Sequence, residues 1–410
     1  MRDGTDKAAA GRRAEILPYV LTVGAVVLAW QIAIQPLMQR APIEAAVRLA
    51  AGSPLVLRRA AESELLAGRV QNAAVLSREA LIRAPFDART LRILGLTEAR
   101  SGQEEKADEI LTLAGNWSLR DDPTHAWLVE RRLQRGDYAS SFAHADTLVR
   151  RRQDMQPQVF KLFTAAGMSD PQRSLPVIAH LLAARPPWRS AYLASLYQTP
   201  QELQLAANLA ILLEPGRAPL TNFELQSLYR TLLSNRQLLA LNTVRGRLNR
   251  PPPNIAVTNG GFADPAAPDP FQWRLMQKAG ITSEIVVDDL RHSNPALRVD
   301  YNGYAIGAIA EQLTSLEPGA YKLAAEVRTE TGNPTERLAW TLACAPGGEA
   351  IASVPAGALS AKPNTWATLA GRIEVPEGCP AQWLQLVARP EDYRSPTVAW
   401  FDNVTISPVD

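Results

Sequence analysis

The chain has 410 residues, which is too long for one ordinary hydrophobic core, so we expect two or more folded units. Hydrophobic residues make up 46% and charged residues 20%, a globular composition that excludes a disordered or collagen-like chain. The 43 basic and 41 acidic residues nearly cancel, which argues against nucleic acid as a partner. Four histidines and two cysteines offer no spacing that is typical of a Cys/His zinc site.

An apolar segment near the N-terminus predicts a single membrane-spanning helix. Residues 16–34 contain no charged side chain, and a helix of this length measures roughly 28 Å, the thickness of a hydrocarbon core. We place the anchor at residues 16–36. Residues 1–15 carry the positive charge that marks the cytoplasmic side, from Arg2, Lys7, Arg12 and Arg13.

Two alternatives to an anchor remain open. A cleaved signal peptide normally has an apolar core of about 7–15 residues that ends at small residues. This segment is longer and continues through Gln31, Gln35, Pro36 and Met38 without such a site. A buried soluble helix does not explain why the flanking positive charge lies on one side. We therefore expect the segment to be retained as an anchor.

Residues 42–249 have helical periodicity and an internal repeat. Three glycines recur every 34 residues, each in a short polar break: Gly68, Gly102 and Gly136. A small residue follows each glycine by five positions, at Ala73, Ala107 and Ser141. The pattern predicts an array of about six helical hairpins that bury their apolar faces against one another.

This array resembles the tetratricopeptide repeat. One unit is expected to have a first helix at Thr90–Arg100 and a second at Glu104–Ala114, with small Gly95 and Ala107 where the helices approach. The large aromatic residue that the family carries near the start of the first helix is missing from most units. The resemblance implies an α-solenoid with a concave surface for partner proteins; a plain spacer is the alternative.

A proline-rich segment, residues 250–256, is the predicted boundary between the helices and a β domain. Residues 257–410 contain short alternating segments separated by turn signals, and about eight strands predict an antiparallel β-sandwich of jelly-roll type. The predicted strands are Ile281–Val287, Ala296–Val299, Tyr321–Arg328, Leu338–Ala343, Trp366–Val375, Trp383–Ala388 and Ala399–Ile406.

The two ends of this domain resemble jelly-roll carbohydrate-binding modules. The resemblance is carried by Asn259–Phe262 (NGGF), Phe271–Trp273 (FQW) and Trp400–Val404 (WFDNV). It implies that the first and last strands lie side by side and that a structural calcium ion binds there. Asp402 matches one of the family's calcium ligands, whereas position 263 is Ala, so the other ligand is missing unless Asp264 substitutes for it. We expect no other cofactor.

Sugar-binding modules stack sugar rings on exposed aromatic side chains and bind hydroxyl groups through polar ones. The candidates in loop-like context are Trp273, Tyr301, Asn302, Tyr304 and Tyr393. The alternative for each aromatic ring is packing in the core or over its edges.

The two cysteines, Cys344 and Cys379, both lie in the β domain. Outside the inner membrane of a bacterium the surroundings are oxidising, so we predict a disulfide between them. Two buried free thiols are the alternative.

The sequence contains no recognisable catalytic motif, and we expect a protein that is not an enzyme. Asp288, Asp289 and His292 come closest to an acid–base cluster.

The combined resemblances imply a membrane-anchored adaptor of the bacterial cell envelope. Its helices would bind envelope proteins, and its β domain would contact a polysaccharide during assembly or export. It would sit in the inner membrane through residues 16–34, with most of the chain in the periplasm. The alternative is a protein-only scaffold; a glycan-processing enzyme is a distant third.

Overall fold

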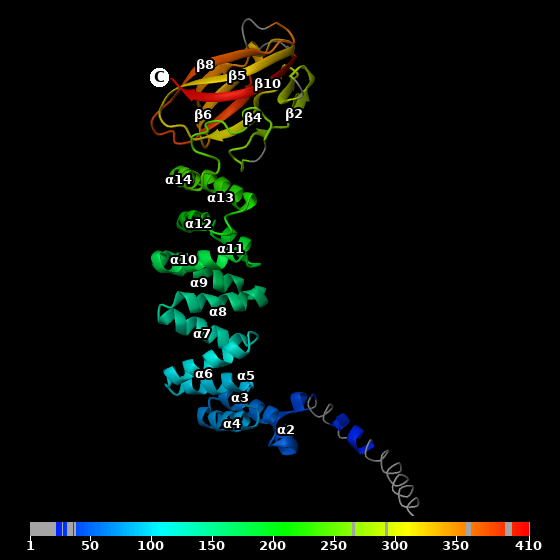
Figure 1. The fold of residues 1–410 in the computed structure, drawn as a ribbon, viewed down its shortest axis with the longest axis vertical. Coiled ribbons are helices and arrows are strands. Elements are labelled where there is room, and N and C mark those ends of the chain that lie inside the picture. Colours follow the sequence, from blue (N-terminus) through cyan, green and yellow to red (C-terminus); the bar gives the residue numbers. More distant parts are fainter. Residues whose placement is uncertain are drawn as a thin grey trace, which may run out of the picture. The chain divides into compact units, whose positions relative to one another are not determined.

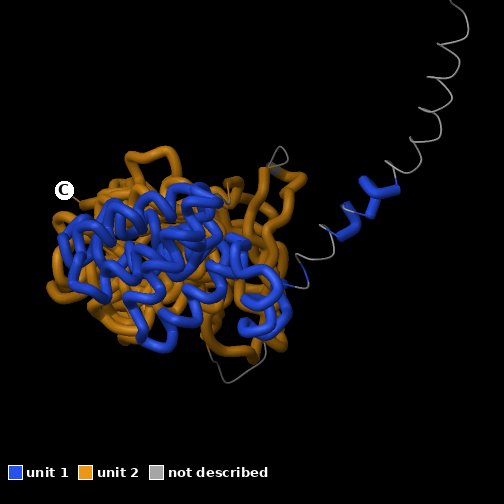
Figure 2. The backbone as a smooth tube through the Cα atoms, turned by 90° about the horizontal axis from the view of Figure 1, so that it is seen from below, with its two compact units in different colours: residues 1–153 blue, residues 154–410 orange. Residues whose placement is uncertain are grey.

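The structure is a computed structural model in which a helical region is followed by two antiparallel β sheets (Figure 1). It describes residues 22–26, 28–30, 36, 38–264, 267–291, 294–357, 362–389 and 396–409. The chain divides into two compact units, residues 1–153 and 154–410, which Figure 2 shows in different colours. The division falls among the helices and not at the proline-rich segment, so the second unit contains both helices and sheets.

The predicted anchor at 16–36 lies mostly outside the described residues, and the predicted cytoplasmic segment at 1–15 lies wholly outside them. In the part of the chain that the structure describes, no helix is both long enough and apolar enough to cross a bilayer.

Helical hairpins make up the first unit. Its helices are α2 (Ile43–Ala50), α3 (Pro54–Leu66), α4 (Val70–Arg83), α5 (Ala88–Arg100), α6 (Glu104–Trp117), α7 (Asp122–Gln134) and α8 (Tyr138–Arg151). The three glycines that recur in the sequence end α3, α5 and α7. Their φ angles are +77°, +78° and +69°, a left-handed conformation that side chains with a Cβ rarely adopt. The turns therefore occur where the glycine spacing predicts them.

A polar contact also repeats at this spacing. Arg58 on α3 pairs with Asp87 at 2.9 Å, and the Thr90 hydroxyl donates to the same carboxylate. One repeat later, Arg92 on α5 pairs with Asp121 at 2.7 Å, and the hydroxyl of Thr124 donates to that carboxylate. Each aspartate lies where the next hairpin begins, so the contact connects successive hairpins.

The second unit begins with more helices: α9 (Gln156–Ser169), α10 (Pro171–Ala183), α11 (Arg189–Ser195), α12 (Pro200–Leu213), α13 (Asn222–Ser234) and α14 (Leu238–Leu248). At the fourth repeat position Asp170 replaces the glycine, and its side chain accepts the backbone N–H of Arg173 at the start of α10. Successive helices pack as pairs at α3–α4, α5–α6, α7–α8, α9–α10 and α13–α14.

The proline-rich segment is held against the last two helices. The buried Arg245 guanidinium on α14 donates to the carbonyls of Pro251, Pro252 and Ile255. Tyr229 on α13 donates its hydroxyl to the carbonyl of Arg250 at 2.6 Å. This segment is therefore a docked connection and not a free tether.

Ten strands in two five-stranded sheets form the β-sandwich. Sheet A has the order β1 (Arg274–Leu275), β4 (Gly307–Thr314), β9 (Gln382–Ala388), β6 (Leu338–Cys344), β7 (Ala350–Pro355). Sheet B has the order β2 (Ile281–Asp288), β3 (Asn294–Tyr301), β10 (Thr397–Pro408), β5 (Gly319–Thr331), β8 (Ala367–Val375). A short helix, α15 (Pro334–Arg337), precedes β6. Between the sheets lies one core that includes Trp340, Leu384 and Phe401.

All seven predicted strands are present, whereas β1, β4 and β7 were not predicted. The opening and closing motifs lie side by side, because the N–H of Val404 donates to the carbonyl of Gly260 at 2.9 Å. A Cβ at position 260 would collide with the Val404 carbonyl, so glycine is required there.

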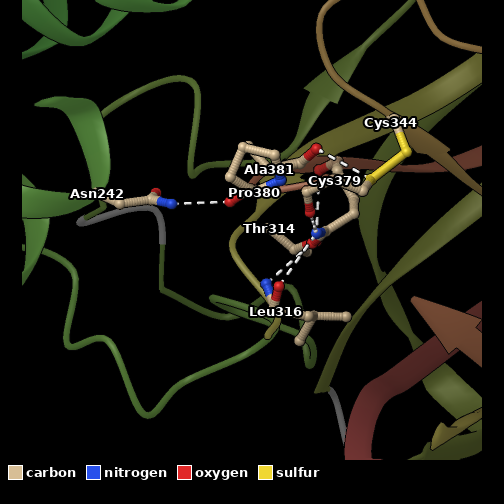
Figure 3. The surroundings of a disulfide bond; sticks show 8 residues. Asn242, Thr314, Leu316, Cys344, Cys379, Pro380 and Ala381 are labelled. Carbon is tan, nitrogen blue, oxygen red and sulfur yellow. Dashed lines mark hydrogen bonds between the residues drawn. A yellow bond between two sulfur atoms is a disulfide. The ribbon is translucent and has the colours of Figure 1, made fainter. Parts of the chain in front are cut away.

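The predicted disulfide is present, with the Cα atoms of Cys344 and Cys379 5.4 Å apart. It connects the end of β6 to the turn before β9 (Figure 3). In the same turn, the Pro380 carbonyl accepts a 2.7 Å hydrogen bond from the Asn242 amide on α14. The crosslinked turn is therefore also a contact between the sandwich and the helices of its own unit.

Candidate functional site

The outer face of sheet A carries the strongest candidate for a binding site. Along β9, Leu384 and Leu386 enter the core between the sheets, so Trp383, Gln385 and Val387 face outward. The strand register extends this outer face over all five strands of the sheet.

Five polar side chains, one from each strand, form a row across this face. Arg274 lies opposite Glu311, Glu311 opposite Gln385, Gln385 opposite Thr341, and Thr341 opposite Ser353. We call these residues the polar row: Arg274, Glu311, Gln385, Thr341 and Ser353. The pairing brings together residues that are far apart in the sequence, so the fold creates the row.

Glu311 is the one carboxylate of the polar row. It is only 5% exposed, which is unusual for a carboxylate on the outer face of a sheet. Its side chain forms an ion pair with Arg274 and accepts a 2.8 Å hydrogen bond from the Gln385 amide. These two partners hold the buried carboxylate in place. The Arg274 side chain is 51% exposed and Gln385 is half-buried, so the guanidinium and the amide are the groups of this cluster that a ligand can reach.

Trp383 adds an aromatic surface beside the row. The Arg274 guanidinium lies 5.7 Å from the centre of its ring, and the ring is half-buried. At the far end of the row Arg389 donates to the Ser353 hydroxyl. Hydrogen-bond donors, acceptors and a ring surface on one face are the groups that bind a sugar's hydroxyl groups and its apolar C–H face.

The sequence analysis also proposed ligand contacts for Trp273 and Tyr301, and both are buried, at 8% and 0% exposure. Trp273 packs against Phe262 and Trp340, with ring centres 5.3 and 5.7 Å away. The Tyr301 hydroxyl donates to the carbonyl of Arg389. Rings in these positions stabilise the core, and a sugar on the surface does not reach them.

Asn302 and Tyr304 lie in the turn between β3 and β4. The Asn302 side-chain oxygen accepts the backbone N–H groups of Tyr304 and Ala305, at 2.9 and 3.3 Å, so this amide shapes the turn. The Tyr304 ring is 60% exposed. Tyr393 lies outside the described residues.

The candidate calcium ligand Asp402 is 3% exposed, and its carboxylate accepts the backbone N–H of Asn403 at 2.7 Å. Where the structure describes the chain, no three His, Cys, Asp or Glu side chains are grouped closely enough to hold a metal ion.

Asp288 has a packing role in the structure. It is 2% exposed, pairs with Arg328 at 3.0 Å and accepts the indole N–H of Trp366 at 2.9 Å. His292, its proposed acid–base neighbour, lies outside the described residues.

The polar row itself was missed in the sequence because three of its five members, Arg274, Glu311 and Ser353, lie in strands that were not predicted. In β4 (GAIAEQLT) Glu311 and Gln312 follow one another, so the segment does not alternate between apolar and polar residues. The available signal was the pair of outward positions at Trp383 and Gln385 in a strand that was predicted.

No protein-family model matches the chain, and no curated protein matches it. Among solved structures, the chain is similar to carbohydrate-binding modules over about 37% of its length. A family 4 module has 15% sequence identity, 99% of its own length covered and a TM-score of 0.28.

Two other modules resemble the chain to the same degree. A family 61 module in complex with β-1,4-galactotriose has 14% identity, 99% coverage and a TM-score of 0.26. A xylan-binding family 22 module of Paenibacillus barcinonensis Xyn10C has 12% identity, 93% coverage and a TM-score of 0.27. At these scores the similarity carries no conclusion about what this chain binds.

Proposed function

We propose that this chain is a membrane-anchored, non-catalytic adaptor of the bacterial cell envelope, acting in the assembly or export of an exopolysaccharide. Its N-terminus would be cytoplasmic and its bulk periplasmic. Its tetratricopeptide-type repeats would bind partner proteins. Its sandwich would bind the polysaccharide on the outer face of sheet A.

One observation carries the glycan-binding part of this proposal: the polar row with Trp383 beside it. A sheltered carboxylate on the outer face is costly unless it is paired, and Glu311 holds the exposed Arg274 guanidinium and the half-buried Gln385 amide in place. Sugar hydroxyl groups can accept from these two groups, and the half-buried indole offers a surface for a sugar's C–H face.

Support for the tetratricopeptide-type repeats comes from the first unit. The glycine turns and the Arg–Asp–Thr contact recur every 34 residues. At Gly95, an added Cβ would lie 2.6 Å from Cγ of Leu111, so α5 and α6 pack at the close distance that the resemblance implies.

The test is binding of the full-length chain to a glycan array and to polysaccharide extracted from the source cell envelope. We expect Glu311→Gln and Trp383→Ala each to weaken binding by about tenfold, the loss of one strong polar contact or one stacked ring. The matched control is Trp366→Ala, since Trp366 is also half-buried and lies 5.9 Å from an arginine, but directly before β8 of sheet B.

The control variant should bind like the wild type. If a folded, disulfide-bonded chain binds none of the glycans, the glycan-binding part of the proposal is wrong. The second candidate would then be a protein-only scaffold, which the burial of Trp273 and Tyr301 favours.

A further inference from the structure

A cavity of about 490 Å³ in the first unit is lined by an unusual number of arginines. Its walls come from α3, from α5 and from the start of α7, together with Gln39. Five guanidinium groups and three carboxylates line it. We call it the arginine cavity, and its charged residues are Arg58, Arg59, Arg89, Arg92, Arg120, Glu62, Asp121 and Asp122.

The carboxylates of the arginine cavity already have partners. Arg92 pairs with Glu62 at 2.6 Å and with Asp121 at 2.7 Å. Asp122 pairs with Arg151 on α8 at 2.7 Å. With five guanidinium groups and three carboxylates, the lining keeps a formal charge of +2.

Arg59, Arg89 and Arg120 supply the surplus positive charge. Arg59 donates to the backbone carbonyls of Met38 and Ala41, which carry no net charge. Arg89 and Arg120 are exposed, and within the described part of the chain neither side chain is within ion-pair distance of a carboxylate. Three guanidinium groups without an acidic partner thus converge on one cavity.

The lining also limits the class of ligand. Leu55 and Pro123 are its only apolar residues, and it has no aromatic ring. The cavity offers no aromatic ring on which a sugar could stack, and it offers little apolar surface for the side chain of a bound peptide. Guanidinium groups match the oxygens of a phosphate group, which they bind through paired, charge-assisted hydrogen bonds.

We propose that the arginine cavity binds a phosphate group, either as a free phosphate or as the headgroup of an anionic lipid. The lipid source rests on the proposed membrane anchor, because Gln39 in the cavity wall follows the apolar segment 16–34 closely in the sequence. Free phosphate as the source needs no membrane.

The experiment measures binding of inorganic phosphate and of short-chain phosphatidic acid to the detergent-solubilised full-length chain, by calorimetry at matched ionic strength. The double variant Arg89→Gln, Arg120→Gln should weaken binding by at least about tenfold, since it removes two charge-assisted contacts to the phosphate oxygens. The matched control, Arg217→Gln, Arg247→Gln, removes the same charge from exposed positions in the second unit and should bind like the wild type.

The two sources are distinguishable. Tighter binding of phosphatidic acid than of phosphate supports the lipid headgroup, and equal binding supports a free phosphate.

Binding no stronger than that of chloride, or an equal loss in the control variant, would overturn the proposal. Binding of poly-glutamate without binding of phosphate would also overturn it, in favour of an acidic peptide. Polysaccharide binding through the polar row should be unchanged in the Arg89, Arg120 variant, which separates this test from that of the proposed function.

Discussion

Two histidines of the first unit make contact in a way that assigns their tautomers. The Nδ1 atoms of His125 and His144 are 3.0 Å apart, and Nε2 of His125 lies 3.2 Å from the Ser118 carbonyl. A carbonyl only accepts, so Nε2 of His125 donates to it, and Nδ1 of neutral His125 accepts the N–H of His144. Burial, followed by the nearby charges of His125 and Arg132, lowers the pKa of His144 from 6.5 to about 4.

This pair should make the first unit sensitive to acid. The folded state binds fewer protons than the unfolded state, so its stability is full above pH 6.5 and falls as the pH drops towards 4. We expect a loss of up to about 3 kcal/mol over this range. Thermal unfolding at several pH values would measure it.

The variant His144→Gln should flatten this pH dependence, because an amide keeps a donor for His125 and does not titrate. His180→Gln is the control, since His180 is exposed on α10. An unchanged pH profile in His144→Gln would rule out this origin of acid sensitivity.

At the scale of elements, the helices differ in how closely they approach their neighbours. An added Cβ at Gly95 would lie 2.6 Å from Cγ of Leu111 on α6, whereas at Gly246 on α14 no atom lies within 4 Å. We expect Gly95→Ala to destabilise α5 and α6 by about 1–3 kcal/mol through overpacking.

Gly246→Ala should have the opposite effect and stabilise α14 by about 0.5–1 kcal/mol, because alanine restricts the unfolded chain without a clash. Hydrogen exchange of the backbone amides in each helix pair would measure both changes. Faster exchange in both variants would contradict the argument for Gly246.

The elements that the sequence predicts are those with a local signal. Glycines at 34-residue intervals locate the turns after α3, α5 and α7, because a left-handed turn requires little more than the glycine itself. Strands β4 and β7 were not predicted because their sequences lack the alternation of apolar and polar residues that indicates a strand. Glu311 and Gln312 interrupt the alternation in β4, and β7 (AIASVP) consists largely of small residues.

The polar row shows the same limit more strongly. Its five members come from five strands, and only the register of the sheet makes them neighbours. Glu311 and Gln385 are 74 positions apart and yet share a hydrogen bond. The sequence indicated the aromatic residues of the domain, but it did not reveal that Trp273 and Tyr301 lie in its core.

At the scale of the molecule, the disulfide should contribute to the stability of the second unit. It joins residues 35 positions apart, and in the chain-entropy account such a crosslink stabilises by up to about 4 kcal/mol. We expect the double variant Cys344→Ser, Cys379→Ser to unfold its β domain at a lower temperature than the oxidised wild type.

Calorimetry with and without reductant would test this expectation. Reductant should lower the melting temperature of the wild type and leave the double variant unchanged. Equal melting temperatures for the oxidised wild type and the double variant would show that the crosslink does not contribute to stability.

The docked connection between α14 and the sandwich limits how this domain can be transplanted. Arg245 and Tyr229 hold the chain from Arg250 to Ile255 against α13 and α14, and Asn242 contacts the turn that carries Cys379. A graft cut at the prolines would leave the Pro380 carbonyl without its partner on α14. The smallest fragment that keeps these contacts begins before α13, near Thr221, which caps that helix. Recombination that exchanges this sandwich between helical arrays would need to carry the last helical pair with it.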